Sequence, residues 1–245
     1  MTQSPFLTAR WVHLLMANYE VTPDSLGALV PRGTELDLWQ GRCLVSVVGF
    51  QFLDTRVLGV SVPFHRNFDE VNLRFYVRCV VGDETRRGVV FVKEIVPRRA
   101  LAWIANAVYG EKYVTLPMMH DDHVEASPRT LTYAWKHRGR WSRLHAALDG
   151  DAYLPSETSE EAFITEHYWG YARQRDGSTL EYQVEHPRWR VWKAKDAGLD
   201  GDVAALYGPV LAPALQRSPA SCFVAEGSEI LVRRGRALFA DRPPG

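Results

Sequence analysis

The chain has 245 residues, and its 29 Lys and Arg residues balance its 29 Asp and Glu residues, so the formal net charge is zero. This balance argues against a general nucleic-acid binder, which usually carries a basic excess, and against a basic membrane-surface protein. Hydrophobic residues make up 46% and charged residues 24% of the chain, an ordinary globular mixture that excludes extensive disorder. We therefore expect one domain over residues 1–245, with a frayed tail at about 236–245.

The cysteines and the N-terminus give no sign of a secreted or membrane protein. Cys43, Cys79 and Cys222 are few, far apart and set in apolar runs, which predicts buried thiols rather than a disulfide framework or a zinc site. The first twenty residues lack the order of a signal peptide, and no apolar stretch approaches the length of a membrane span. We expect a soluble, cytoplasmic protein.

The first half of the chain is predicted to begin with helices and continue with strands. Apolar spacing predicts a helix around Trp11, Leu14, Leu15 and Asn18, and a second short helix follows at Asp24–Leu29. The later elements are a strand at Cys43–Leu53, a hairpin of Glu70–Val81 and Gly88–Val96 around a four-residue GDET turn, and a helix from Pro97 to Gly110.

The second half is predicted to consist mostly of hairpins. One pairs Thr130–His137 with Trp141–Leu148, and another pairs Glu166–Arg173 with Thr179–Glu185 across Asp176-Gly177. The remaining predictions are a short helix at SEEAF, a strand at Trp189–Lys195, helices at Asp202–Tyr207 and Val210–Gln216, and a last hairpin of Ser221–Ala225 with Glu229–Arg234. Because the strands do not alternate with long helices, the fold class is α+β and mostly antiparallel, built on a large sheet or barrel.

Familiar catalytic motifs are missing from the sequence, including the phosphate-binding glycine loops and the nucleophile elbow. The run from Met118 to His123 has two histidines that flank two aspartates, which resembles a metal site at first sight. It follows Pro117 and is predicted to be a solvated loop, because a specific site would need further ligands in a fixed geometry. No metal and no cofactor are expected.

The strand EVNLRFYVR places polar side chains on one face. Glu70, Asn72, Arg74 and Tyr76 alternate with apolar residues, and a pairing of Val81 with Arg86 would set Arg74 opposite Lys93. Two interpretations stay open. The face is either a solvated surface of ion pairs or a polar cup inside a curled sheet, where partly desolvated charges would have shifted pKa values.

A second informative face comes from the Asp176-Gly177 hairpin. A two-residue loop would set Tyr171 opposite Tyr182, Trp169 opposite Val184 and His167 opposite His186. These side chains either pack a core or form an aromatic ligand wall, and the two histidines could form a pH-sensitive pair.

Several long strings resemble one family: FLTARWVHLLMANYEV, LVPRGTELDLWQGRCLVSVVGFQF, FDEVNLRFYVR and EHYWGYARQRDGSTLEYQVEHPRW. They are similar to the uncharacterised YqjF-like family, domain of unknown function 2071, over about Phe6 to Val232. That family is grouped with the acetoacetate decarboxylase-like superfamily. The resemblance implies a large twisted antiparallel sheet curled into a cone-like barrel with a few helices outside, and it favours the cup interpretation.

The resemblance also implies candidate site residues. Decarboxylases of the superfamily form a Schiff base on a lysine within a Pro-Lys-Lys motif, assisted by a pocket glutamate and arginine. Glu70 takes the place of the glutamate. The matching segment of this chain reads Tyr109-Gly110-Glu111-Lys112-Tyr113, so Tyr113 takes the place of the reactive lysine. The departure argues against Schiff-base chemistry, for which Lys112 or, less favourably, Lys93 would have to serve.

Two hypotheses for function follow. In the first, the protein is a lyase, hydratase or isomerase for a small oxo-acid or carbonyl compound. Glu70 is then the general acid/base, Arg74 the anion clamp, and Lys112 or Tyr113 lies at the reacting carbon. In the second, it is a non-catalytic binder or sensor on the same fold. The expected ligand-binding residues are Asn72, Tyr76, Lys93, His167, Trp169, Tyr171, Tyr182 and His186. The expected partner is a small molecule, not nucleic acid or a membrane, and a homo-oligomer is open.

Overall fold

The structure is a computed structural model that describes residues 5–61, 66–97 and 112–239. A single fifteen-stranded sheet connects the described strands, and most neighbours are antiparallel. The strands are β1 (Leu7–Val21), β2 (Thr34–Leu36), β3 (Cys43–Val57), β4 (Val60–Ser61), β5 (Phe68–Val81), β6 (Glu84–Val96), β7 (Tyr113–Thr115), β8 (Met118–Asp122), β9 (Thr130–His137), β10 (Arg140–Tyr153), β11 (Trp169–Arg173), β12 (Thr179–Glu185), β13 (Val191–Asp200), β14 (Ser221–Val232) and β15 (Arg236–Leu238).

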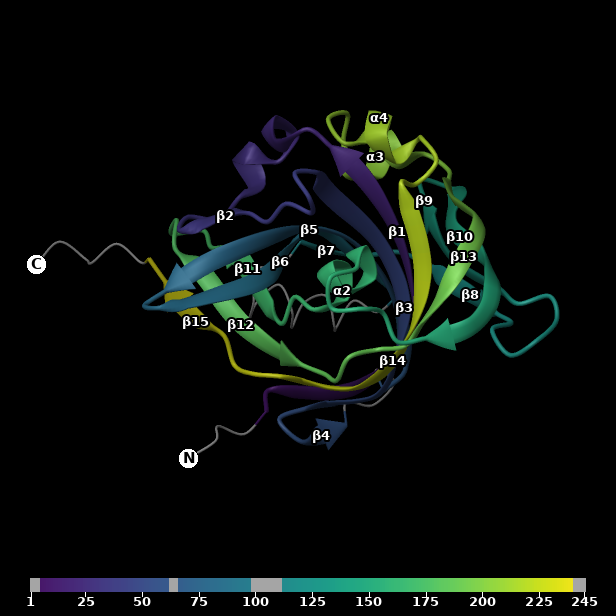
Figure 1. Cartoon of the computed structure of the whole chain (residues 1–245), viewed down its shortest axis with the longest axis horizontal. Coiled ribbons are helices and arrows are strands. Elements are labelled where there is room, and N and C mark those ends of the chain that lie inside the picture. The colour runs from purple at the N-terminus through teal and green to yellow at the C-terminus, as the bar shows by residue number, and fades with distance from the viewer. Residues whose placement is uncertain (1–4, 62–65, 98–111, 240–245) are drawn as a thin grey trace, which may run out of the picture.

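Seven of these strands curl into a ring. The order runs β12, β11, β6, β5, β3, β1 and β14, and the ring closes where β14 returns to β12 through the pairs of Val184 with Val232 and Glu185 with Leu231. Figure 1 looks into this ring and shows helix α2 (Glu160–Thr165) over its centre. Ser159 caps α2 by accepting a hydrogen bond from the backbone N–H of Ala162. The expected mostly antiparallel curled sheet is confirmed.

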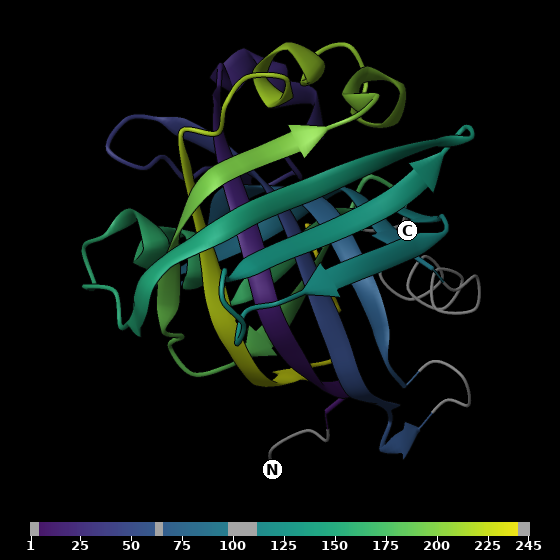
Figure 2. The ribbon, with the colours of Figure 1, turned by 90° about the vertical axis from the view of Figure 1, so that its right-hand side faces the viewer.

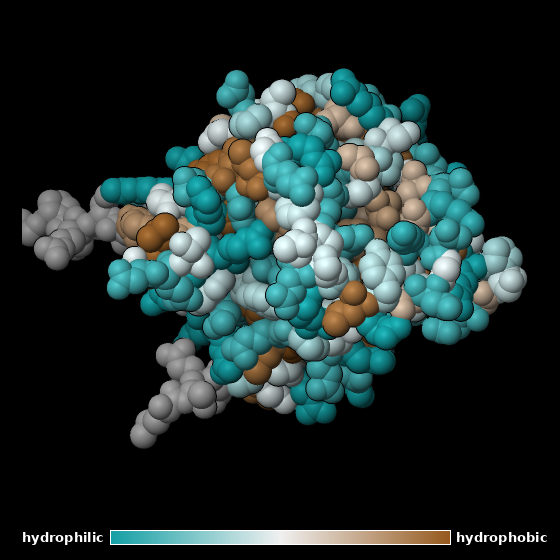
Figure 3. All heavy atoms as spheres, viewed as in Figure 1, coloured by the Kyte–Doolittle hydropathy of each residue, from teal (hydrophilic) through white to brown (hydrophobic). Residues whose placement is uncertain are grey.

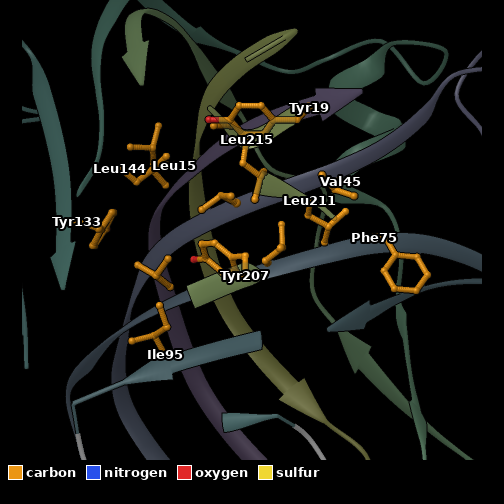
Figure 4. Close-up of a cluster of buried hydrophobic side chains, with 14 of the residues drawn as sticks. Leu15, Tyr19, Val45, Phe75, Ile95, Tyr133, Leu144, Tyr207, Leu211 and Leu215 are labelled. Atoms are coloured by element: carbon orange, nitrogen blue, oxygen red, sulfur yellow. The ribbon is translucent and has the colours of Figure 1, made fainter. Parts of the chain in front are cut away.

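A second part of the sheet, β13-β10-β9-β8, continues from β14 and folds across the outside of the ring. Figure 2 shows these four strands crossing in front of β1, β3 and β14. The larger hydrophobic core lies between them and the outer faces of β1, β3 and β5. Helices α3 (Val203–Tyr207) and α4 (Ala212–Leu215) pack onto this core (Figure 4). The second core cluster has its side chains on the opposite, inner face of the ring.

The predicted N-terminal helix is wrong, because residues 7–21 form strand β1. Both faces of this strand are buried, so Leu14 and Met16 pack inside the ring while Leu15 and Ala17 pack outside. Strands that are buried on both faces lose the alternation that identifies them. A register shift after Val12 adds to the irregularity. The apolar residues therefore recur at a spacing that resembles a helix.

Three further predictions are corrected. The last hairpin is wrong, because these residues form one continuous strand, β14, in which Gly227 pairs with Val12. Gly227 has a positive φ of 84°, and a side chain there would strike the Trp11 carbonyl. Residues 118–122 form edge strand β8 rather than a loop. The short helix at Asp24–Leu29 is instead two 3₁₀ turns, Pro23–Ser25 and Gly27–Leu29.

The tail predicted to fray from about residue 236 begins instead with strand β15, which pairs with β12. The other predicted elements within the described residues are found, with shifted ends. The helix predicted from Pro97 to Gly110 lies outside the described residues beyond Pro97. All three cysteines are free, with Cys43 and Cys79 buried. In the part of the chain that the structure describes, no helix combines the length and apolar character needed to cross a membrane. Polar and apolar residues are mixed over the face shown in Figure 3.

Candidate functional site

A cavity of about 130 Å³ lies inside the ring. An apolar cavity of about 150 Å³ binds benzene, so this space suits a molecule of that size class rather than a nucleotide cofactor. Strands β1, β3, β5, β6, β11 and β12 contribute most of its walls, and the lining is largely apolar. The polar residues that line it include Glu70, Asn72, Arg74, Glu94, Tyr113, Thr165, His167, Tyr182 and His186.

Glu70 is a carboxyl group of the cavity wall with a strongly raised pKa. It is 3% exposed, and its Oε1 accepts a hydrogen bond of 2.9 Å from Asn72 Nδ2. Burial raises the pKa of Glu70 from 4.5 to about 7, because the charged form loses its hydration, while the Asn72 hydrogen bond and the charge of Arg74 act in the opposite direction. Glu70 can therefore both hold and release a proton near neutral pH.

Two further acidic groups lie in register with Asn72. Glu94 on β6 pairs with Asn72 on β5 and with Tyr113 on β7, so the three residues form a row across neighbouring strands. Burial first, and then the charges of Glu70 and Glu94, raise the pKa of Tyr113 well above 10. The phenol consequently stays protonated at neutral pH, and its side-chain hydrogen bond with Glu94 raises the pKa further.

Arg74 brings a positive charge to the same wall. Its Nη2 donates to the backbone oxygen of Ile164 at 3.2 Å and lies 3.9 Å from the Met16 sulfur. Its Nε is buried and has no hydrogen-bond partner among the described residues. Since buried donors are nearly always satisfied, a cation with a spare donor in a cavity is suited to an anionic ligand group.

Two histidines line the cavity in neutral form. His167 Nε2 lies 3.1 Å from Asp37 Oδ2, and Asp37 also accepts a hydrogen bond from Arg87. Burial nevertheless lowers the pKa of His167 to about 4. The ring of His186 stacks on Trp189 at a centroid distance of 3.9 Å, and burial likewise lowers its pKa to about 4.

An aromatic cluster lines the part of the cavity farthest along β5 from Arg74. The Trp11 ring makes edge contacts with Phe50 at 5.2 Å and with Phe52 at 5.7 Å, and Phe52 stacks on Phe68 at 4.6 Å. Phe50 and Phe52 pair with Glu70 and Phe68 across β3 and β5. The cavity thus has a polar part near Asn72 and Arg74 and an aromatic part near Phe68.

The structure brings eight of the twelve predicted site residues to this cavity: Glu70, Asn72, Arg74, Tyr113, His167, Trp169, Tyr182 and His186. It supports the cup interpretation of the Glu70 face over a solvated surface, because Glu70 and Asn72 are buried. The predicted pairing of His167 with His186 does not occur, because both lie outside the paired residues of β11 and β12.

Four predicted residues are not among the lining residues. Tyr76 is buried next to His167, and its hydroxyl is hydrogen-bonded to Ser46 at 2.5 Å. Lys93 Nζ donates to the Leu206 carbonyl at 2.5 Å, in the outer core, and Lys112 is exposed. Tyr171 packs in the outer core and donates to Glu181 at 3.1 Å.

Two incorrectly predicted strand registers explain why the side chains of Lys93 and Tyr171 do not line the cavity. The β5–β6 turn has two residues rather than four, so Val81 pairs with Glu84. A bulge between Leu73 and Arg74 then places Leu73 opposite Lys93 and Arg74 opposite Phe91. The β11–β12 loop is longer than predicted, with Arg173 paired to Thr179, so Tyr171 faces Glu181 instead of Tyr182. A change of one residue in register moves a side chain to the other face of a sheet.

Sequence reasoning missed Glu94 and the aromatic cluster around Trp11. Glu94 follows Lys93 directly, and only the bulge decides which of the two faces inward. Trp11 was assigned to a helix, where its neighbours could not be foreseen. The apolar run of Cys43–Leu53 did indicate a buried strand, although nothing in it marked Phe50 and Phe52 as cavity residues.

The positions of the lysines bear on Schiff-base chemistry. The sequence holds five lysines, Lys93, Lys112, Lys136, Lys193 and Lys195, and all lie in the described residues. None of them is among the described residues that line the cavity. Across the described ranges, no group of three or more His, Cys, Asp or Glu side chains is arranged to hold a metal ion.

Comparisons with known proteins agree with this architecture. Residues 8–229 match the family model DUF2071, described as an uncharacterized conserved protein. The uncharacterized protein YqjF of Bacillus subtilis is 25% identical over 189 residues, which is 76% of this chain and 74% of YqjF.

Solved structures share the fold at low identity. The enduracididine biosynthesis enzyme MppR in complex with pyruvate has a TM-score of 0.70 and 14% identity, covering 98% of this chain and 93% of MppR. Acetoacetate decarboxylase from Legionella pneumophila has a TM-score of 0.69 and 12% identity, covering 96% of this chain and 87% of the decarboxylase. The fold is therefore acetoacetate decarboxylase-like.

Proposed function

The chain belongs to the DUF2071 family, and we propose that it is an enzyme that moves a proton at the carbon next to the carbonyl of a small carboxylic acid. The observation that carries the proposal is Glu70, a buried carboxyl group in the cavity wall with a pKa of about 7. A general acid/base works best when its pKa lies near the working pH. Strongly perturbed carboxyl groups in cavities are characteristic of catalytic sites.

The neighbouring residues supply the other parts of such a reaction. Arg74 binds the substrate carboxylate through its spare donor and fixes the orientation. The Glu70 carboxylate then takes the proton from the carbon, which leaves an enolate and a protonated Glu70. The Tyr113 hydroxyl, whose hydrogen-bond partner in the wall is Glu94, turns its hydrogen bond to the enolate oxygen and stabilises the charge that develops there. Return of the proton to the same or another carbon completes an exchange or an isomerisation.

The fold relatives support a small oxo-acid as the substrate class. MppR has been solved with pyruvate and with the condensation product of pyruvate and imidazole 4-carboxaldehyde, and acetoacetate decarboxylase is named for another oxo-acid. The absence of a lysine from the described cavity lining argues against an amine-catalysed route for this chain. The expected cytoplasmic location stays a prediction.

Hydrogen exchange tests the proposal directly. The protein is incubated in D₂O with pyruvate, acetoacetate and longer oxo-acids, and proton NMR follows the loss of the signal next to the carbonyl. We expect Glu70→Gln to slow exchange at least 100-fold, within the range of about 10²–10⁴ typical of general acid/base groups. Glu125→Gln, which changes an exposed glutamate, should exchange at the wild-type rate. Equal rates for wild type and Glu70→Gln would refute the role of Glu70.

A non-catalytic binder is the second candidate, and the lack of a lysine in the described cavity lining favours it. Binding of an oxo-acid without any exchange above the protein-free rate would support this candidate over the enzyme. Borohydride trapping followed by mass measurement tests the remaining alternative, and a covalent adduct on Lys112 or Lys93 would contradict both proposals.

A further inference from the structure

Two buried hydrogen-bond donors of cavity-lining residues have no partner in the described structure. One is Arg74 Nε, and the other is the indole Nε1 of Trp11. Such groups are rare in folded proteins because each one costs free energy, and a bound ligand is one of the recognised explanations. Trp189, a second cavity tryptophan whose ring lies next to Trp11, is different, because its Nε1 donates to Ser228 at 2.9 Å.

The two donors lie at different levels of the ring. Arg74 Nη2 lies near Met16. Met16 pairs with Val48, and Val48 pairs with Asn72, so this donor lies at the level of Asn72 in the ring. The Trp11 ring contacts Phe50 and Phe52, which stand level with Glu70 and Phe68. Two to four residues of strand separate these levels, or roughly 7–13 Å at about 3.3 Å per residue. A ligand that reaches both donors is therefore a short chain rather than a compact group.

The charges of the lining residues restrict the far end of this ligand. Arg74 is the single cation among the described residues that line the cavity, because the other basic residues there, His167 and His186, have pKa values of about 4. A second carboxylate placed at the aromatic end would be buried without a counter-charge, which is strongly unfavourable. The tail must be uncharged where it passes Phe50 and Phe52.

We propose that the cavity selects a short-chain monocarboxylic acid whose uncharged tail ends in a hydrogen-bond acceptor, such as a keto oxygen, that binds Trp11 Nε1. The carboxylate lies at Arg74, the chain passes along the aromatic cluster, and the acceptor meets the indole. This tail acceptor is separate from the carbonyl whose enolate oxygen the proposed function assigns to Tyr113. This assignment rests on the proposed function for the idea of a small-acid substrate, and it adds the class of acid and the residue that recognises the tail.

Three acids of equal chain length test the assignment by calorimetry: 4-oxopentanoate, pentanoate and glutarate. The tail of 4-oxopentanoate carries a keto oxygen, the tail of pentanoate carries no polar group, and the tail of glutarate carries a second carboxylate. We expect 4-oxopentanoate to bind about three- to tenfold more tightly than pentanoate, the usual effect of one neutral hydrogen bond, and glutarate to bind at least about tenfold more weakly than 4-oxopentanoate. Equal binding of pentanoate and 4-oxopentanoate, tight binding of glutarate, or no binding of any of the three would overturn the proposal.

Matched tryptophan variants identify the donor. Trp11→Phe keeps an aromatic ring but removes Nε1. The ratio of the affinity for 4-oxopentanoate to that for pentanoate should therefore fall to about one, while the affinity for pentanoate stays within about twofold of the wild-type value. Trp189→Phe removes an indole N–H that already has a protein partner, so the ratio should be retained. A preference that survives in Trp11→Phe refutes the role of Trp11. If Trp11→Phe does not fold, the wild-type series alone decides the ligand class.

The binding series and the exchange assay fail independently. Selective binding of 4-oxopentanoate without proton exchange would leave this inference standing and remove the enzymatic proposal. Proton exchange on acids that bind without any preference for a tail acceptor would leave the enzymatic proposal standing and remove this inference.

Discussion

Replacement of Glu70 by glutamine should stabilise the folded protein at high pH. The wild-type protein holds a carboxyl group whose pKa is about 7 when folded and 4.5 as the ordinary value. Below pH 4.5 the group is protonated in both states, and Glu and Gln are nearly equivalent. Between pH 4.5 and 7 the unfolded chain releases the proton while the folded chain retains it, so the free energy of unfolding of the wild type falls as pH rises.

The size of the effect follows from the same two values. One pKa unit corresponds to about 1.4 kcal/mol, so the difference between 4.5 and about 7 corresponds to about 3 kcal/mol above pH 7. The attraction to Arg74 and the Asn72 hydrogen bond are already contained in the folded-state pKa. A glutamine at this position does not titrate, and it can still accept the hydrogen bond from Asn72 Nδ2.

Urea unfolding of both proteins at pH 4.5, 6 and 8 measures this difference. The gain in stability of Glu70→Gln over wild type should grow from near zero at pH 4.5 to about 3 kcal/mol at pH 8. Glu125→Gln, at an exposed position, should show no such growth. Parallel pH profiles of wild type and Glu70→Gln would mean that the Glu70 pKa is ordinary, and the argument for a catalytic carboxyl group would fail with it.

Two further substitutions test the cavity. Arg74→Gln should weaken binding of an oxo-acid anion by about 10- to 100-fold, as expected for a lost charge-assisted hydrogen bond, and should leave binding of the corresponding neutral amide nearly unchanged. Calorimetry with both ligands measures this difference. An equal loss of affinity for the amide would argue against an anion clamp. Gly170→Ala should destabilise the protein by about 1–3 kcal/mol, because the added methyl group would lie 2.1 Å from the ring of Tyr182 and force this cavity residue to move. Thermal unfolding measures the loss of stability. An unchanged melting temperature would contradict the close packing of Tyr182 on Gly170.

The candidate site was predictable where a single strand determined it. Glu70, Asn72 and Arg74 alternate on β5, so they share a face whatever strand lies next to them. Their burial was not predictable from alternation alone, since a solvated face of ion pairs has the same pattern. It became an expectation only through the family resemblance, which implied that the sheet curls around a pocket.

Predictions that depended on two strands were less secure. The side chains of Lys93 and Tyr171 were assigned through assumed hairpin registers, and a shorter turn, a longer loop and one bulge reversed both. Strand β1 was missed for a related reason. Its burial on two faces comes from the second part of the sheet folding over the ring, a long-range arrangement that no local pattern contains.

Tyr113 connects the departure from the decarboxylase motif with the chemistry proposed for the cavity. By spacing it takes the place of the reactive lysine, and the structure places it beside Glu94 in the cavity wall. A buried lysine with a lowered pKa is a nucleophile, whereas a buried phenol with a raised pKa keeps its proton at neutral pH and acts only through hydrogen bonds. Under the proposed function, the exchange of an amine for a phenol removes covalent catalysis and leaves a group that can stabilise an oxyanion. Glu70, with a pKa of about 7, is then the group that we propose moves the proton.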